Sequence, residues 1–162
     1  VHQHFVLVSP FTVVENVALG LDNSGILLDL EHVEKKLGEL CLEYDIELDL
    51  QAKISQLSVG EQQWVEILKA LYTGVDLLIL DEPTAVLTPQ ETAKFFTILT
   101  KMTLEGLAII FITHKLKEVM ELSDRIAVMF RGEIVAVVDA KEVTKEQVGL
   151  LMAGVVIEEA GG

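Results

Sequence analysis

Residues 11–73 carry apolar positions at helical spacing between charged ones, which predicts a mostly helical region. Thr12 and Glu15, and later Ser58 and Glu61, have the spacing of capping boxes and predict two helix starts. A further amphipathic helix is predicted over 29–44. The apolar stripes of the two longer helices are Val33, Leu37, Leu40, Cys41 and Tyr44, and Trp64, Ile67, Leu68, Leu71 and Tyr72.

The pattern changes at Gly74, where short continuous apolar runs replace the helical stripes. The runs 75–80 and 107–113 are typical of strands buried on both faces, and a helix beginning near Pro89 separates them. Further along, a short helix over 115–122, strands over 125–130 and 133–139 and a last helix from Thr144 are predicted. Strands alternating with helices indicate an α/β sheet.

Composition narrows the classes of partner. The 162 residues suffice for one domain with a real core, and the net charge of −14 argues against nucleic acid or bare anionic lipid as the main partner. No apolar run approaches the ~20 residues that a membrane-spanning helix needs. The single Cys41 excludes an internal disulfide and favours a reducing compartment.

The run "LLILDEP" carries the strongest chemical signal. It brings Asp81 and Glu82 to the carboxyl end of a predicted parallel strand, where α/β sheets bind their ligands. Asp81 is placed to support Mg²⁺, and Glu82 to polarise a water for attack on a phosphate. His114 follows the next predicted strand and is expected at the same edge, within reach of a terminal phosphate. The alternative is that Asp-Glu-Pro merely ends the strand in a solvated turn.

The helix start at Ser58 also has two interpretations. The capping box alone explains a serine and a glutamate three residues apart. The exposed amides, hydroxyl and glycine of "LSVGEQQ" equally suit a seat for phosphate.

In their order and spacing, "LSVGEQQ", "LLILDEPT" and "THK" resemble the ATPase subunits of ATP-binding-cassette (ABC) transporters. "VHQHFVLVSPFTVVENVALG" resembles their Q-loop, with Gln3 in the glutamine position. The resemblance implies a P-loop NTPase-like α/β core sheet flanked by helices, with a helical signature subdomain. The corresponding segments are 1–20 for the Q-loop region, 21–73 for the helical subdomain and 74–162 for the core with Walker B, His114 and the last helix.

Site roles follow from the same resemblance. Ser58, Val59, Gly60 and Glu61 form the signature loop, which would close on the ATP of an opposing cassette in a head-to-tail dimer. Glu82, His114 and Gln3 would be catalytic, and Asp81 and Gln3 would hold Mg²⁺. The partners implied are a second cassette and transmembrane permease subunits, on the cytoplasmic side of the membrane.

Details such as "DEPTAVLTPQE" resemble the first cassette of tandem importer ATPases for simple sugars or nucleosides. Val59, Glu61 and Thr88 depart from the commonest family residues, and Thr88 stands where an aspartate is usual. No glycine is followed by lysine, so the phosphate loop (Walker A) is absent from these residues. We therefore expect a cassette lacking its N-terminal third, inactive alone, with an uncovered flank near 75–80 and 107–113 that favours self-association.

Two other functions stay open at this point. The chain could be a non-catalytic module that docks on a permease or a partner cassette, with a vestigial Asp-Glu pair. A soluble ABC-type ATPase of DNA repair or translation fits less well, because the charge is acidic and the Q-loop region resembles transporters.

Overall fold

The computed structural model describes residues 7–21 and 29–155, which divide into two compact units, Val1–Ile112 and Thr113–Gly162. The predicted segment boundary at 73/74 falls inside the first unit and stays a prediction. In the part of the chain that is described, no helix combines the length and the apolar character needed to cross a membrane.

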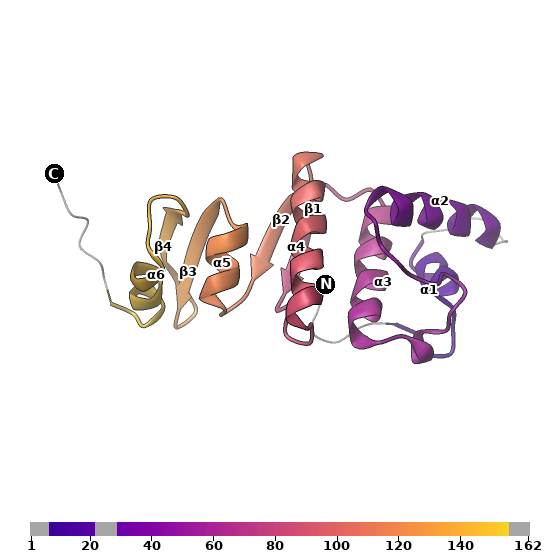
Figure 1. Ribbon diagram of the computed structural model, residues 1–162, viewed down its shortest axis with the longest axis horizontal. Coiled ribbons are helices and arrows are strands. Elements are labelled where there is room, and N and C mark those ends of the chain that lie inside the picture. The colour runs from indigo at the N-terminus through magenta and orange to yellow at the C-terminus, as the bar shows by residue number, and fades with distance from the viewer. Residues whose placement is uncertain (1–6, 22–28, 156–162) are drawn as a thin grey trace. The chain divides into compact units, whose positions relative to one another are not determined.

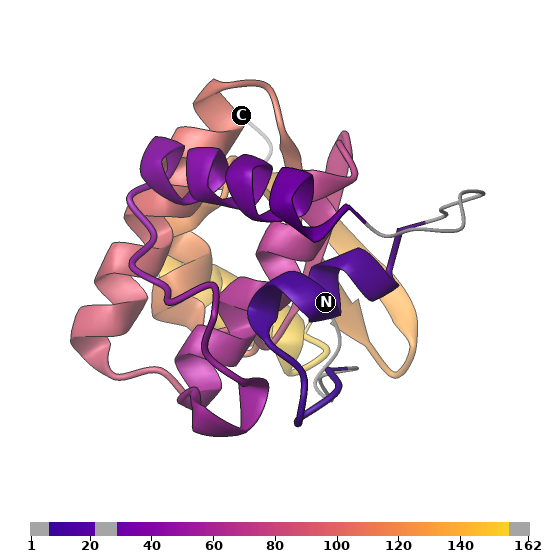
Figure 2. The same cartoon turned by 90° about the vertical axis from the view of Figure 1, so that its right-hand side faces the viewer.

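The first unit begins with three mutually packed helices, seen together in Figures 1 and 2. Their bounds are α1 Val13–Leu19, α2 Leu30–Glu43 and α3 Val59–Tyr72, with a 3₁₀ turn, η1, at Ile54–Gln56. The predicted capping boxes at Thr12 and Ser58 are both formed. The predicted α3 stripe is incomplete, because Gln63 and Val65 are buried as well as Ile67, Leu68 and Tyr72.

The same unit continues into a two-stranded parallel sheet, β1 Leu77–Asp81 with β2 Ala108–Ile112, and the connecting helix α4, Pro89–Leu104. Phe96 of α4 meets Phe111 of β2 edge to face, with ring centroids 5.9 Å apart. Since Leu80 pairs with Phe111, α4 covers the sheet face that carries them. Trp64 of α3 packs on Phe95 of α4, so α4 also joins the helices to the sheet.

The opposite face of this sheet is exposed. The prediction of burial on both faces is therefore wrong, because helices cover one side only of the described strands. The predicted uncovered apolar flank is confirmed. Its large side chains are Leu77, Ile79, Ile110 and Ile112, each 46–48% exposed.

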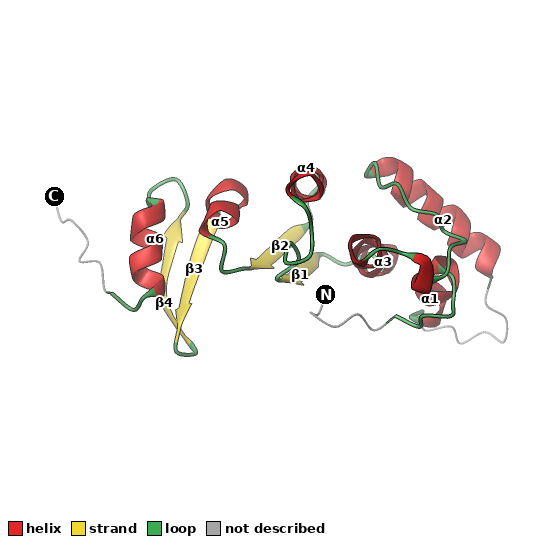
Figure 3. Cartoon of the chain, turned by 60° about the horizontal axis from the view of Figure 1, so that its bottom comes forward, coloured by secondary structure: helices red, strands yellow, loops and turns green. Residues whose placement is uncertain are grey.

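The second unit contains α5 Leu116–Leu122, the antiparallel pair β3 Arg125–Phe130 and β4 Glu133–Asp139, and α6 Lys145–Met152. The two strand pairs of the described residues are drawn in yellow in Figure 3. The predicted tight turn is formed with positive φ at both Arg131 and Gly132, as hairpin turns of the type I′ class require. The buried core of the unit is built from Ile126, Val128, Val148 and Leu151.

Candidate functional site

The signature loop is shaped by the start of α3. The Ser58 hydroxyl accepts a hydrogen bond from the Glu61 amide at 3.3 Å, and a Glu61 carboxylate oxygen accepts one from the Ser58 amide at 2.7 Å. Ser58 and Val59 are nevertheless exposed. Ser58 therefore caps α3 and, together with Val59, is also exposed to solvent.

Gly60 lies against the loop that follows β1. A Cβ built on Gly60 would lie 3.1 Å from Leu87 Cδ2, so a larger residue would crowd this contact. Leu87 directly precedes Thr88, which caps α4 through its own box with Glu91. Hydrogen bonds from the Thr88 backbone and side chain hold the pKa of Glu91 below its usual value. Thr88, which replaces the usual aspartate, therefore has a structural task as a helix cap.

Gln62 of α3 also holds the residues that precede the signature loop, although no sequence motif marks it for this role. Its Nε2 donates to the Leu57 carbonyl at 3.0 Å and to the Ile54 carbonyl at 3.4 Å. Glutamine is common on helix surfaces, so only the three-dimensional position of these two carbonyls reveals the contact.

Asp81 and Glu82 lie where β1 ends. Asp81 is the last strand residue, paired with Ile112, and Glu82 donates its amide to the Ile112 carbonyl at 2.9 Å. Glu82 has φ of 46°, a left-handed conformation that is uncommon for glutamate and concentrates at functional sites. The sharp turn takes the chain away from the sheet directly after the second carboxylate. The prediction that both acids stand at the carboxyl end of a parallel strand is confirmed.

These carboxylates can supply part of a Mg²⁺ shell. Among residues 7–21 and 29–155, no group of three or more His, Cys, Asp or Glu side chains is arranged to hold a metal ion. Mg²⁺, however, commonly takes one or two carboxylates and completes its shell with phosphate oxygens and water. Asp81 fits that partial role, whereas a protein-only metal cage is not present in the described residues.

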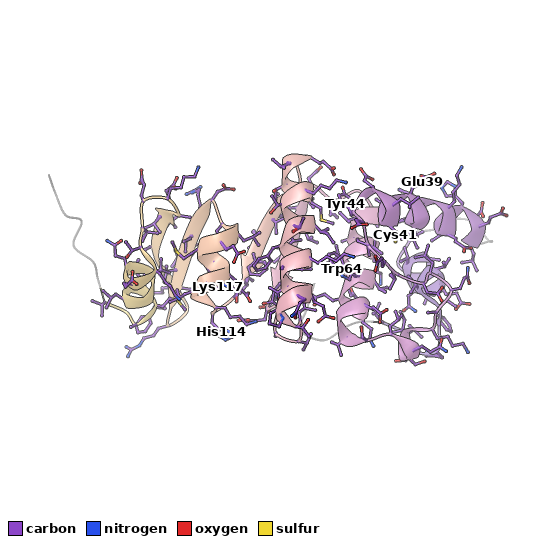
Figure 4. All side chains as sticks on the ribbon, viewed as in Figure 1. Glu39, Cys41, Tyr44, Trp64, His114 and Lys117 are labelled. Carbon is purple, nitrogen blue, oxygen red and sulfur yellow. The ribbon has the colours of Figure 1, made fainter. Side chains whose placement is uncertain are left out.

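His114, labelled in Figure 4, belongs to the second unit and precedes Lys115, the N-cap residue of α5. Both sequence neighbours of His114 are tied to Glu118, which is 8% exposed. Lys115 Nζ lies 3.1 Å from a Glu118 oxygen, and the Thr113 hydroxyl donates to the other at 3.4 Å. The Lys115 amide in turn donates to the Thr113 hydroxyl at 3.1 Å. Glu118 thus holds the side chains of the residues on either side of His114.

Gln3 lies outside the described residues, so its assigned roles remain predictions. The catalytic and binding roles of the signature loop, Asp81, Glu82 and His114 likewise remain predictions, although their local geometry is now defined.

Comparison with known proteins decides the family. Residues 1–85 match the family model described as ABC transporter. The chain belongs to the ABC transporter family. This confirms the resemblance and the P-loop NTPase-like fold class inferred from the motifs.

Named relatives of this cassette are import proteins. It is 48% identical to the nucleoside import ATP-binding protein NupA of Lactococcus lactis subsp. cremoris, over 95% of this chain and 31% of that protein. It is 43% identical to the glucose import ATP-binding protein TsgD13 of Haloferax volcanii, over 95% and 33%. The guanosine import ATP-binding protein NupO of Bacillus subtilis is 42% identical, over 95% and 30%. The chain therefore spans about a third of the length of these relatives.

Solved ABC cassettes share the fold. The cassette MJ0796, solved as a dimer, superposes with a TM-score of 0.72 at 28% identity, over 86% of this chain and 61% of that one. The cbiO1 protein of Clostridium perfringens, part of the ABC transporter complex cbiONQ, gives 0.73 at 28%, over 92% and 59%.

Proposed function

We propose that this cassette belongs to the ATP-hydrolysing subunit of an ABC importer for simple sugars or nucleosides. The relatives named above support the direction of transport and the solute class. The observation that carries the proposal is the exposed signature loop, which the chain itself holds in shape but leaves uncovered.

In this proposal the loop binds the terminal phosphate of ATP held by an opposing cassette. The capping box already satisfies the Glu61 amide, while no acceptor contacts the amides of Val59 and Gly60 within the described residues. The first amides of a helix have no partner in their own helix, and the helix dipole adds roughly half a positive charge there. Phosphate oxygens, together with the Ser58 hydroxyl, satisfy this geometry.

The other residues act at the cassette's own nucleotide. Asp81 holds Mg²⁺, which neutralises charge on the phosphates when it is bound. Glu82 accepts a hydrogen bond from the attacking water and orients it. His114 contacts the terminal phosphate, and Glu118 keeps the loop that carries His114 in place. Gln3 is assigned by family resemblance alone.

The proposed partners follow from the loop. A second cassette supplies the ATP that the signature loop contacts, and permease subunits anchor the pair at the cytoplasmic side of the membrane. The dimeric structure of MJ0796 supports the first of these partners.

Complementation tests the proposal without requiring a phosphate loop in this chain. A complete ABC cassette is prepared with its own phosphate loop intact and its signature serine replaced, so that its homodimer hydrolyses ATP slowly. Added wild-type chain is expected to restore ATP turnover, and chain carrying Ser58→Ala is expected not to. Ser55→Ala is the matched control, because Ser55 is also exposed and lies in η1 just before the loop.

Failure of the wild-type chain to restore turnover, despite forming a complex with the complete cassette, would favour the non-catalytic docking module. Equal restoration by wild type and Ser58→Ala would refute the assigned role of the hydroxyl.

A further inference from the structure

Asn16 is a buried amide in an otherwise apolar part of α1. It is 2% exposed and is surrounded in sequence by the buried residues Val13, Val14, Val17 and Ala18. A buried amide is costly unless it is hydrogen-bonded, so this position needs a reason. Helix capping is not that reason, because Thr12 already caps α1.

The hydrogen bonds of Asn16 supply the reason. Its Oδ1 accepts from the Val8 amide at 2.7 Å, and its Nδ2 donates to the Val8 carbonyl at 3.2 Å and to the Thr12 carbonyl at 2.9 Å. One side chain therefore holds both backbone groups of Val8 against the first turn of α1. Val8 lies five residues after Gln3 in the sequence.

The segment held by Asn16 is itself bonded to residues 50–55. Backbone amides donate from Ser55 to Ser9 and from Ile54 to Phe11, each at 3.0 Å, and an antiparallel bridge joins Thr12 to Lys53. In the other direction, amides of 13 and 14 donate to the carbonyls of 52 and 50. We call residues 8–16 and 50–55, with these bonds, the backbone clamp.

The backbone clamp continues directly into the signature loop. Ile54 begins η1, and its carbonyl and that of Leu57 accept from the Gln62 side chain of α3. Ile54 also packs with Val13 of α1 and Val65 of α3, all three at most 2% exposed. Hydrogen bonds and a buried contact thus connect Val8 to the residues on both sides of Ser58.

We propose that Asn16 is a positioning residue that makes the segment following Gln3 and the signature loop move as one body. A displacement of residues 8–12 is then transmitted through 50–55 to Ser58 and Gly60. The functional consequence rests on the proposed contact between the signature loop and ATP, whereas the mechanical coupling does not.

Hydrogen exchange on the 162-residue chain tests the coupling. Asn16→Ala removes all three bonds and is expected to speed exchange about tenfold, as expected for losing a net hydrogen bond, both at 8–14 and at 54–62. Val17→Ala is the matched control: it truncates a fully buried neighbour on the same helix but touches no clamp bond. In Val17→Ala, the exchange rates at 8–14 and 54–62 are expected to keep their wild-type ratio to the rates in the rest of the first unit.

Asn16→Asp covers the case in which Asn16→Ala does not fold, because aspartate keeps the acceptor for the Val8 amide and loses both donated bonds. It is expected to speed exchange in the same two segments together. The proposal would be overturned if exchange became faster at 8–14 but stayed unchanged at 54–62. It would also be overturned if Val17→Ala sped exchange selectively in both segments, as Asn16→Ala is expected to do.

The complementation assay supplies the functional readout. Asn16→Ala is expected to lower the kcat for ATP turnover severalfold with little change in the KM for ATP, since the nucleotide is held by the other cassette. An unchanged kcat, with exchange coupled as expected, would overturn the functional half of the proposal. If Ser58→Ala has no effect in that assay while the two segments still exchange together, the proposed phosphate contact of the signature loop is refuted. The mechanical coupling through the backbone clamp is then still supported.

Discussion

Ser58 is predicted to have two tasks that substitutions can separate: it caps α3, and its hydroxyl binds phosphate. The cap is visible as the reciprocal pair of hydrogen bonds with Glu61. An N-cap serine replaced by alanine costs about 1 kcal/mol, whereas asparagine caps about as well as serine. Ser58→Ala should therefore destabilise the first unit by about 1 kcal/mol, and Ser58→Asn by a few tenths at most.

The chain contains a reporter for this comparison. Trp64, the only tryptophan, lies on α3 with its ring centroid 5.1 Å from that of Phe95. Its emission during urea titration follows the first unit, which avoids treating the two units as one transition. For a unit of the size of Val1–Ile112, a loss of 1 kcal/mol corresponds to a fall in Tm of about 4 °C.

Activity in the complementation assay then separates the two tasks. If the hydroxyl binds phosphate, Ser58→Ala and Ser58→Asn both lose ATP turnover, although only alanine loses stability. Should Ser58→Asn restore turnover along with stability, the hydroxyl acts as a cap alone. An unchanged Tm in Ser58→Ala would instead refute the energetic role given to the capping box.

Three further predictions concern the rest of the fold. Gly154→Ala should destabilise the second unit by about 1–2 kcal/mol in urea unfolding, because φ is 79° and a Cβ would lie 2.6 Å from the Phe130 ring. Burial raises the pKa of Tyr44 to about 12, so stability should fall as pH rises from about 10 to 12, and Tyr44→Phe should remove this dependence. Ile110→Thr should reduce self-association in light scattering while changing stability by at most about 0.5 kcal/mol.

Each of these predictions has a control in the chain. Gly132→Ala places alanine at a positive φ of 85° with no atom within 4 Å, so it should cost less than Gly154→Ala. Tyr72→Phe should leave the alkaline loss due to Tyr44 in place. Ile134→Thr changes an exposed isoleucine of β4, and if it disperses the protein as well as Ile110→Thr does, association is not specific to the first sheet.

Local chemistry explains why much of the fold could be predicted. The boxes at Thr12, Ser58 and Thr144 each begin a helix, because the interacting groups lie within one turn of each other in the sequence. The predicted strand ranges 125–130 and 133–139 are likewise confirmed, since Gly132 supplies the backbone conformation that the turn between them needs. The position of Asp81 and Glu82 at a strand end followed from the length of the apolar run.

Other features depend on contacts distant in sequence. The apolar runs of β1 and β2 indicate that both strands favour burial. They do not indicate that α4 covers only one face of the sheet, because that depends on the packing of α4. The burial of Gln63 and Val65 on α3 has the same cause, because several elements surround this helix. Asn16 was missed because an asparagine after a capping box resembles an ordinary surface residue until its Val8 partner is known.

The signature loop is held in shape before any partner is present. Ser58 is hydrogen-bonded to Glu61, and the Leu57 carbonyl before it accepts from Gln62. The residues that lead into the loop, 50–55, are bonded to α1 and the segment before it through the backbone clamp. Ordering loops and side chains at an interface weakens association, and a preformed surface avoids most of that cost. In the proposed head-to-tail dimer, a second cassette would therefore meet a loop that needs little rearrangement to accept phosphate. By the same reasoning, the bonds of Asn16 hold the approach to the loop in its bound shape, so substitutions there should lower turnover together with the local stability of residues 8–14 and 54–62.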